Sequence, residues 1–411
     1  MLRARQSNPW LPRGAGCSYG DAALLDQGNL LLMDHPLDDE AISEIAGSVI
    51  VSGSLTLRQL LSSLAAEGLT LPVVPGVLDA TVGGVIAADA HGKNHLNRGS
   101  LRDVTDSLQI LLPDGELVDC DHQNHRDLFE GTIGGMGLTG MILSARLQVI
   151  PFAGPRALVE VTRTRDLEAS LEQLQIQAQR QEHVAVWIDP TPSGAAFGRG
   201  IVAAGTTESD QGDGKTDWRL PRGCPFPPGL GRLLNRRTLC WHNQFRYGVT
   251  RVGAVPRRWK LEQLLFPLER WSNWKRIYQP GGFHQHQSLL PPGSSFDAVR
   301  DLLEHACSGP LVPTLVVAKC MRRGGGWLSF PDEGITLTID IRADGGSVDL
   351  LRKLDEIVAG HGGKVYLAKD TTLTPQLLER MYPDHSRFME LRERIDPDRR
   401  IESELSRRLG L

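Results

Sequence analysis

Residues 75–95 read PGVLDATVGGVIAADAHGKNH, a run dominated by glycine, alanine and other small residues. Glycine adds no Cβ and leaves its N–H accessible, so such a run lets the backbone lie flat against an anionic ligand. Two further glycine loops flank it, PRGAGCSYGD at residues 12–21 and GTIGGMGLTG at residues 131–140. A single loop of this kind is usually an ordinary turn. Three in order within the first 140 residues favour a nucleotide cofactor.

A dinucleotide-binding Rossmann turn is the first alternative for these loops. The loop at residues 12–21 misses the G-x-G-x-x-G spacing by one residue, and residues 22–28 are too short for the crossover helix of a βαβ unit. Residues 135–140 do fit the spacing, but residues 141–151 read as a strand that ends at a proline. The sequence therefore disfavours a Rossmann site.

The chain resembles the flavoproteins of vanillyl-alcohol-oxidase type, whose FAD domain surrounds the cofactor with such loops instead of a Rossmann fingerprint. Within that family it is most similar to the branch that oxidises decaprenylphosphoryl-ribose. The resemblance covers nearly the whole chain and is weakest at about residues 155–260. The matching segments are residues 13–14, 18–21, 81–84, 91–95, 137–140, 282–283, 285, 287, 368–370, 381–383, 396–397 and 407–409.

The resemblance implies an α+β protein in which a two-subdomain FAD-binding domain carries an inserted substrate domain built on an antiparallel sheet. We expect the first part of the FAD-binding domain at residues 1–153, the substrate-binding domain at 154–365 and a C-terminal return to the FAD-binding domain at 366–411. A chain of 411 residues also exceeds the size at which one core usually keeps growing.

Local patterns agree with a mixed fold. Residues 57–67 carry leucines at helical spacing and end at Gly68, a good C-terminal glycine. Residues 109–119 predict a hairpin that turns at Asp114-Gly115. Further strands are predicted at residues 30–34, 48–53, 184–188, 314–319 and 335–341, and helices at residues 165–182 and 295–305.

Composition excludes several classes of function. Forty-five basic and 49 acidic residues give a net charge of -4, which offers no electrostatic case for nucleic acid. Six cysteines form no C-x-x-C pair, so we expect free thiols, and no metal site is predicted. The chain has no apolar run of membrane-spanning length, and residues 1–6 lack the apolar core of a signal peptide. The expected location is the cytoplasm, with peripheral contact at the membrane.

Residues 221–258 are the candidate for that membrane contact, because a lipid-linked substrate lies in a bilayer. Basic side chains interleaved with aromatic and apolar ones could rest on anionic headgroups. A solvated loop with a basic helix face explains the same pattern equally well. The residues concerned are Arg232, Arg236, Arg237, Trp241, Arg246, Arg251, Arg257 and Arg258, with Trp259 just beyond. Residues 209–217 predict a flexible surface loop.

Oxidation of a secondary alcohol needs a hydride acceptor and a group that receives the hydroxyl proton. The resemblance implies Lys369 beside the flavin, where a cation would also stabilise the anionic reduced ring. It implies His91 on the flavin face and Tyr19 as an orienting group. Taken singly, each is more often a salt-bridged or satisfied polar residue. The joint match favours a catalytic set.

The remaining contacts are also implied by the resemblance. Substrate contacts are expected from Lys93, Gln285, Gln287, Lys319 and Thr338. FAD contacts are expected from Arg13, Gly14, Ala15, Gly16, Cys17, Ser18, Tyr19, Gly76, Thr81, Gly83, Gly84, Ala88, His91, Gly92, Asn94, Gly134, Gly137, Thr139 and Gly140.

The sequence departs from the family at three places. Where many members carry a histidine bonded to the flavin, the first loop has Cys17, so we predict non-covalent FAD and leave a cysteinyl linkage open. Thr338 stands where some members carry a cysteine attacked by nitroaromatic inhibitors, and threonine cannot form that thiol adduct. Eleven residues precede Pro12, where the family normally has a strand and a helix, so either the start is truncated or a sheet edge is exposed.

We therefore expect FAD-dependent oxidation of a sugar secondary alcohol, C2 of a polyprenyl-phosphoryl-ribose, to the 2-keto sugar. A separate NAD(P)H-dependent ketoreductase would complete the epimerisation to the arabinose form. One alternative is a soluble alditol or aldonolactone oxidase, against which the missing covalent histidine counts. The other is a flavin-free binding relative, against which the three glycine loops and Lys369 count. Oxygen and quinone both remain open as electron acceptors.

Overall fold

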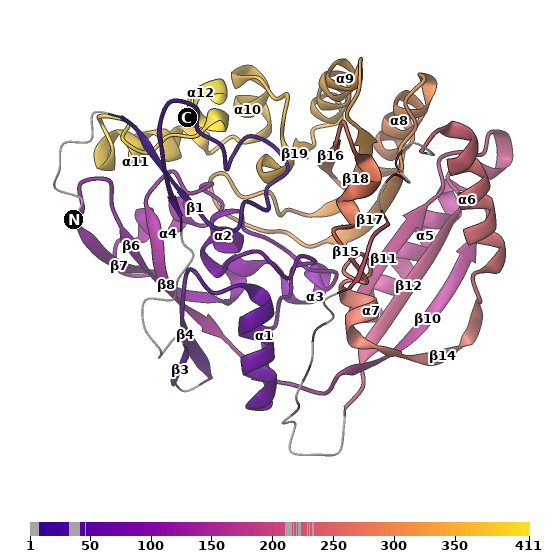
Figure 1. Ribbon diagram of the computed structural model, residues 1–411, viewed down its shortest axis with the longest axis horizontal. Helices are drawn as coiled ribbons and strands as arrows, with labels where there is room; N and C mark the ends of the chain where they lie inside the picture. Colours follow the sequence, from indigo (N-terminus) through magenta and orange to yellow (C-terminus); the bar gives the residue numbers. More distant parts are fainter. Residues whose placement is uncertain are drawn as a thin grey trace.

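The computed structural model describes residues 8–32, 42–45, 47–209 and 234–411, together with residues 216, 218, 220, 223–227, 229 and 231. Two antiparallel sheets lie toward opposite sides of the molecule (Figure 1). One has five strands in the order β3-β4-β8-β6-β7, and the other has eight in the order β14-β10-β12-β11-β17-β18-β16-β19. The α+β fold class predicted from the sequence is confirmed.

The five-stranded sheet comes from the first 150 residues. Its strands are β3 (Ile42–Ile45), β4 (Ser48–Ser52), β6 (Thr105–Leu111), β7 (Leu117–Asp121) and β8 (Met141–Gln148). The predicted hairpin is confirmed, with Leu111 paired to Leu117 across the turn. Helix α1 (Leu57–Ala66) is capped by Thr56, whose side chain accepts from the Gln59 N–H in a capping box. It ends before Gly68, as predicted. The other short elements of this part of the chain are β5 (Leu69–Thr70), α3 (His95–Arg98), η1 (Leu101–Val104), α4 (Arg126–Thr132) and β9 (Ile150–Pro151).

The middle of the 75–95 run contains a helix that glycine loops do not suggest. Helix α2 (Val82–Ala87) begins at Thr81, whose hydroxyl accepts from the Gly84 N–H at 3.2 Å. Two glycines in six residues disfavour a helix. Burial of Val82, Val85 and Ile86 in the core offsets that penalty.

The eight-stranded sheet comes from residues 156–365, inside the predicted substrate-binding domain, whose boundaries remain a prediction. Leu337 and Ile339 face helices on one side of the sheet and join the core. Because side chains alternate along a strand, Thr336, Thr338 and Asp340 face the other side. The strands are β10 (Arg156–Thr164), β11 (His183–Ile188), β12 (Gly200–Thr207), β14 (Gly253–Lys260), β16 (Phe283–Leu290), β17 (Leu315–Met321), β18 (Gly334–Arg342) and β19 (Lys364–Val365).

Helices cover the apolar face of this sheet and connect its strands. The predicted helices are confirmed as α5 (Leu167–Ala178) and α8 (Ser295–Ser308), which contact the sheet together with α9 (Ser347–Gly360). The other elements of this part are η2 (Gly194–Ala196), β13 (Cys224–Pro225), α6 (Arg236–Val249), α7 (Leu261–Leu265), β15 (Trp271–Ser272) and η4 (Trp274–Tyr278).

The C-terminal segment packs against the start of the described chain. The Trp10 N–H donates to the Arg400 carbonyl at 2.7 Å, and Trp10 bridges Ile401 in parallel. The elements are β1 (Trp10–Arg13) paired with β2 (Asn29–Leu32), then η5 (Leu367–Lys369), α10 (Pro375–Met381), α11 (His385–Ile395) and α12 (Glu404–Leu409). Figure 1 shows these last helices beside β1. Residues distant in sequence thus form one side of the molecule.

Some sequence predictions fall outside the described residues. The strand predicted at residues 30–34 is described only as far as Leu32, and most of the loop predicted at residues 209–217 is not described. Within residues 221–258, α6 and β14 are described, whereas Arg232 is not. No described helix is long and apolar enough to cross a membrane.

Candidate active site

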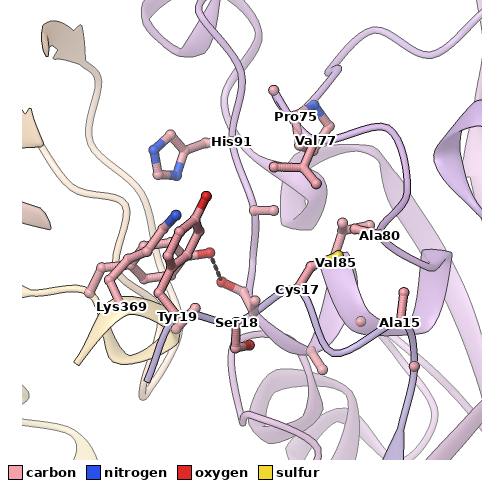
Figure 2. Close-up of a pocket in the computed structure, with 18 of the residues that line it drawn as sticks. Ala15, Cys17, Ser18, Tyr19, Pro75, Val77, Ala80, Val85, His91 and Lys369 are labelled. Atoms are coloured by element: carbon pink, nitrogen blue, oxygen red, sulfur yellow. Dashed lines mark hydrogen bonds between the residues drawn. The ribbon is translucent and has the colours of Figure 1, made fainter. Parts of the chain in front are cut away.

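A cavity of about 350 Å³ lies between the first two glycine loops and the polar face of the eight-stranded sheet. Figure 2 shows His91, Lys369 and Tyr19 together at one end of it, with Cys17, Ala80 and Ala15 farther along. All the predicted site residues except Asn94, Gly134 and Thr139 line this cavity. The fold therefore collects residues from the beginning, middle and end of the chain around one space.

The first loop forms an anion cradle at one end of the cavity. The backbone N–H groups of residues 15–18 have no acceptor within the described chain. Gly16 adopts φ +63°, a conformation that turns successive N–H groups toward one side. A Cβ on Gly14 would lie 2.2 Å from the Thr81 hydroxyl, so only glycine allows the two loops to meet. Free N–H groups beside Arg13 suit the diphosphate of a dinucleotide.

Gly83 and Gly84 line the cavity but contribute differently from the first loop. The Gly83 N–H donates to the Gly53 carbonyl at 2.8 Å, and the Gly84 N–H donates to Thr81. These N–H groups are therefore already bonded within the protein. A Cβ on Gly83 would lie 3.2 Å from the Gly53 carbonyl oxygen, so this glycine permits α2 to pack closely on the backbone at Gly53.

Three adjacent strands supply the polar wall of the cavity. Gln285 on β16 pairs with Asp340 on β18, and Gln287 pairs with Thr338. Lys319 on β17 pairs with Thr336, two residues along the same face. The period of two places all these side chains on the cavity side of the sheet. The sheet therefore brings four of the predicted substrate residues together, namely Gln285, Gln287, Lys319 and Thr338.

Lys369 lies at one end of a short polar chain that runs through Gln285 to Asp340. Its ammonium donates to Gln285 Oε1 and lies 3.8 Å from the centre of the Tyr19 ring. Gln285 in turn donates through Nε2 to Asp340 Oδ1 at 2.7 Å. Burial lowers the pKa of Lys369 to about 7, with Asp340 opposing the shift. Burial also raises the pKa of Asp340 to about 6. The lysine can thus change protonation near neutral pH.

His91 is held neutral against an aromatic wall. Gln287 Nε2 lies 3.1 Å from His91 Nε2, so that ring nitrogen accepts and Nδ1 carries the hydrogen. Nδ1 is buried and has no partner among the described residues. The ring stacks on Phe330 at 5.7 Å and meets Tyr366 at the same distance. Burial, followed by Lys319, holds the pKa of His91 well below its usual range.

Two further lysines differ in how they are held. Lys93 donates to the carbonyls of Leu264 and, at 3.0 Å, Leu265, at the end of α7. Lys319 makes no hydrogen bond or ion pair within the described chain. Burial lowers the pKa of Lys93 to about 7 and that of Lys319 to about 8. Of these two lysines, Lys319 is therefore the one with free hydrogen-bonding capacity within the described chain.

Three predicted cofactor residues lie outside the cavity lining and contact other parts of the protein. Asn94 donates to the Pro72 carbonyl at 2.9 Å, and Thr139 bonds the Thr132 hydroxyl at 2.8 Å. A Cβ on Gly134 would lie 2.6 Å from the Ser329 hydroxyl. None of the three is among the described residues that line the cavity. Direct cofactor contact by these residues is not supported by their positions.

Sequence reasoning missed several residues of the site. Tyr366 lines the cavity and donates to the Ala88 carbonyl at 2.8 Å, while Asp340 fixes Gln285 from the next strand. Alternation along β18 could have placed Asp340 on the face of Thr338. Lys275, which lies 4.7 Å from the Tyr19 ring, carries no such local signal.

Comparisons with known proteins agree with this geometry. Residues 2–121 match the model of an FAD binding domain, and residues 328–409 match the model of a D-arabinono-1,4-lactone oxidase domain. The chain is 29% identical over 98% of its length to decaprenylphosphoryl-beta-D-ribose oxidase of Mycolicibacterium smegmatis, covering 89% of that protein. It belongs to the FAD-dependent oxidase family.

The chain is also similar to two other proteins. The chain is 33% identical over 87% of its length to a Streptomyces coelicolor protein described as an uncharacterized protein in the mprA 5′ region, all of which is covered. It is 23% identical over 97% of its length to mouse L-gulonolactone oxidase, with 89% of that protein covered. The cofactor of this FAD-dependent oxidoreductase accepts a hydride when bound. The flavin-free alternative is therefore set aside.

Proposed function

We propose that this FAD-dependent oxidase acts on a sugar secondary alcohol, C2 of a polyprenyl-phosphoryl-ribose, and releases the 2-keto sugar. Lys369 and His91 hold or receive the hydroxyl proton at the reacting carbon, and Tyr19 orients the ring of the cofactor or the sugar. Gln285, Gln287 and Lys319 bind the sugar phosphate against the sheet. A separate NAD(P)H-dependent ketoreductase takes the keto sugar to the arabinose form.

The charge of the cavity is the observation that carries this proposal. Arg13, Lys93, Lys319 and Lys369 line it, and none of the described lining residues is an aspartate or glutamate. The first loop and Arg13 suit the cofactor diphosphate at one end. Lys319 lies at the sheet end and has no hydrogen-bond or ion-pair partner among the described residues, so a second anionic group is favoured there. A sugar phosphodiester supplies that charge.

An alditol or aldonolactone oxidase is the second candidate. The match of residues 328–409 to a lactone oxidase domain and the similarity to L-gulonolactone oxidase support it. A neutral polyol or lactone leaves Lys319 without a charged partner, however. We therefore rank the phosphodiester-linked sugar first.

Anaerobic flavin bleaching separates the two candidates. The purified protein, loaded with FAD, is mixed with a short-chain polyprenyl-phosphoryl-ribose, and the flavin absorbance is followed against ribitol, xylitol and L-gulonolactone. Bleaching by the phosphoryl-ribose alone is the expected result. Bleaching by a free polyol or lactone alone would transfer the assignment to the second candidate.

The pH dependence of KM gives an independent check. The cationic forms of Lys93, Lys369 and Lys319 prevail below their pKa values of about 7, about 7 and about 8. They lose charge as the pH rises through that window, so attraction for an anionic substrate is strongest below it. We expect KM for the phosphoryl-ribose to rise about tenfold from the acidic side of pH 7 to pH 9. A pH-independent KM measured in steady-state assays would contradict an anionic substrate in this cavity.

A further inference from the structure

Helix α6 carries an exposed stripe of aromatic and aliphatic side chains. Trp241, Phe245 and Val249 are 70%, 55% and 55% exposed, and their spacing of four residues places them on one side of the helix. The rings of Trp241 and Phe245 stack at 5.7 Å. Leu239 and Asn243, on the opposite side, are buried. Within the described chain the stripe is therefore an uncovered face of a helix that is well anchored on its other side.

The segment of chain that carries the stripe is basic. Arg237 extends the same row by one turn, and the segment from residue 236 to residue 260 contains seven lysines and arginines and no acidic residue. Arg237, Arg251 and Arg257 are exposed, and their side chains make no ion pair or hydrogen bond within the described chain. Arg258, in contrast, pairs with Glu208 at 2.6 Å. Free arginines beside exposed aromatic rings suit an anionic surface with an apolar interior.

The segment that carries the stripe continues directly to the cavity. Residue 253 begins β14, the edge strand of the eight-stranded sheet, and Lys260 leads into α7. The carbonyls at the end of α7 bind Lys93, and Pro267 and Leu268 just beyond it line the cavity. A surface bound to α6 would thus be linked to the cavity wall by one short stretch of chain.

We propose that the α6 stripe, defined as Arg237, Trp241, Phe245 and Val249, docks the protein on an anionic lipid bilayer. The aromatic rings enter the headgroup region and the arginines contact lipid phosphates. This docking deepens the proposed function and rests on it, because a polyprenyl chain holds the substrate in the bilayer. An anionic membrane offers phosphates to the arginines and an apolar interior to the exposed aromatic rings.

Vesicle flotation tests the docking directly. FAD-loaded protein is mixed with phosphatidylcholine vesicles with or without about one third phosphatidylglycerol, and the floated fraction is measured at low and high salt. We expect flotation with the anionic vesicles only, weakened by salt. The Trp241→Ser/Phe245→Ser variant and the Arg237→Glu/Arg251→Glu variant should each lower the partition coefficient about tenfold or more.

A matched control comes from the opposite side of the molecule. Leu117 on β7 is 58% exposed and Arg126 at the start of α4 is exposed, and Figure 1 shows both elements far from α6. The Leu117→Ser/Arg126→Glu variant should float like the unmodified protein. No flotation of the unmodified protein, or equal losses in the control, would overturn the docking. So would concentration-dependent dimerisation abolished by Trp241→Ser/Phe245→Ser, which would assign the stripe to a second copy.

Oxidation of the short-chain phosphoryl-ribose in the same samples separates this inference from the proposed function. Because the short-chain compound is soluble, its oxidation needs no membrane. Intact oxidation without flotation removes the docking alone. Flotation without oxidation removes the proposed substrate and leaves a membrane-docking oxidase.

Discussion

Replacing Lys369 by methionine is expected to leave the protein yellow and to slow its anaerobic flavin reduction at least about 100-fold. The ammonium donates to Gln285 and lies over the Tyr19 ring, so its loss removes the cation nearest the proposed reacting centre. Loss of one such preorganised group typically costs about 3 kcal/mol in the transition state. Stopped-flow mixing with the substrate measures the reduction rate without the reoxidation step.

A surface lysine provides the control for this effect. Lys353 on α9 is exposed and, among the described residues, pairs with Glu356 alone, so Lys353→Met should reduce its flavin at the normal rate. The bound-flavin spectrum of Lys369→Met should match that of the unmodified protein, because the free N–H groups of residues 15–18 are untouched. Unchanged reduction in Lys369→Met would remove this lysine from the chemistry. Loss of FAD would instead assign it to cofactor binding.

Asp340 is linked to Lys369 through Gln285, so the Lys369 substitution also changes the environment of this carboxyl group. Its carboxylate is buried and accepts from Gln285. Removing the lysine therefore leaves a buried carboxyl group near Gln285 with less compensation, which raises its pKa further. The site is a coupled pair of titrating groups bridged by one amide.

Much of the fold could be predicted from local patterns. The leucine spacing of α1, the cap at Thr56 and the glycine at Gly68 are all local features of the sequence. They therefore define this helix and its two ends without knowledge of distant contacts. The alternation of β18 likewise fixes which residues share a face. Helix α2 was missed because its two glycines disfavour a helix, whereas its stability comes from buried tertiary contacts.

The sequence predicted most of the residues that line the cavity, but not the partners that their polar groups bind. The resemblance assigned Lys93 to the substrate, but its ammonium bonds carbonyls at the end of α7, in a region near the weakest part of that resemblance. Gly83 and Gly84 were assigned to the cofactor, yet their N–H groups bond within the protein. Such partners depend on the relative placement of distant segments, which no local pattern specifies.

Arg408 illustrates this point, because it ties together three segments that are distant in sequence. Its guanidinium donates to both carboxylate oxygens of Asp21 at 2.8 Å, to Asp370 at 2.9 Å and to the Leu373 carbonyl at 2.7 Å. Asp21 ends the first glycine loop, and Asp370 directly follows Lys369. A Cβ on Gly20 would lie 1.7 Å from the Asp370 carbonyl oxygen, so the two loops are in direct contact there. Arg408 therefore positions both the cofactor cradle and the proposed catalytic lysine.

Replacing Arg408 by methionine should destabilise the protein by about 3 kcal/mol and weaken FAD binding. Asp370 is fully buried, and burial already raises its pKa while Arg408 opposes the shift. Breaking a buried pair leaves its carboxylate without a counter-charge, which is the costly case. Denaturant unfolding of the FAD-free protein measures the stability, and fluorescence titration measures FAD affinity.

The neighbouring Arg407 is the matched control. It pairs with the part-exposed carboxylates of Glu402 and Glu404 and donates to the exposed Asp26 carbonyl at 2.8 Å, so Arg407→Met should cost less than about 1 kcal/mol. Adding Asp370→Asn to Arg408→Met removes the unpaired charge and should recover part of the lost stability, while FAD affinity and flavin reduction stay low because the tie to Asp21 is still absent. Equal losses in the two single arginine variants would show that Arg408 is an ordinary surface cation. Full recovery of all three quantities in the double variant would assign the whole effect to the buried charge rather than to loop positioning.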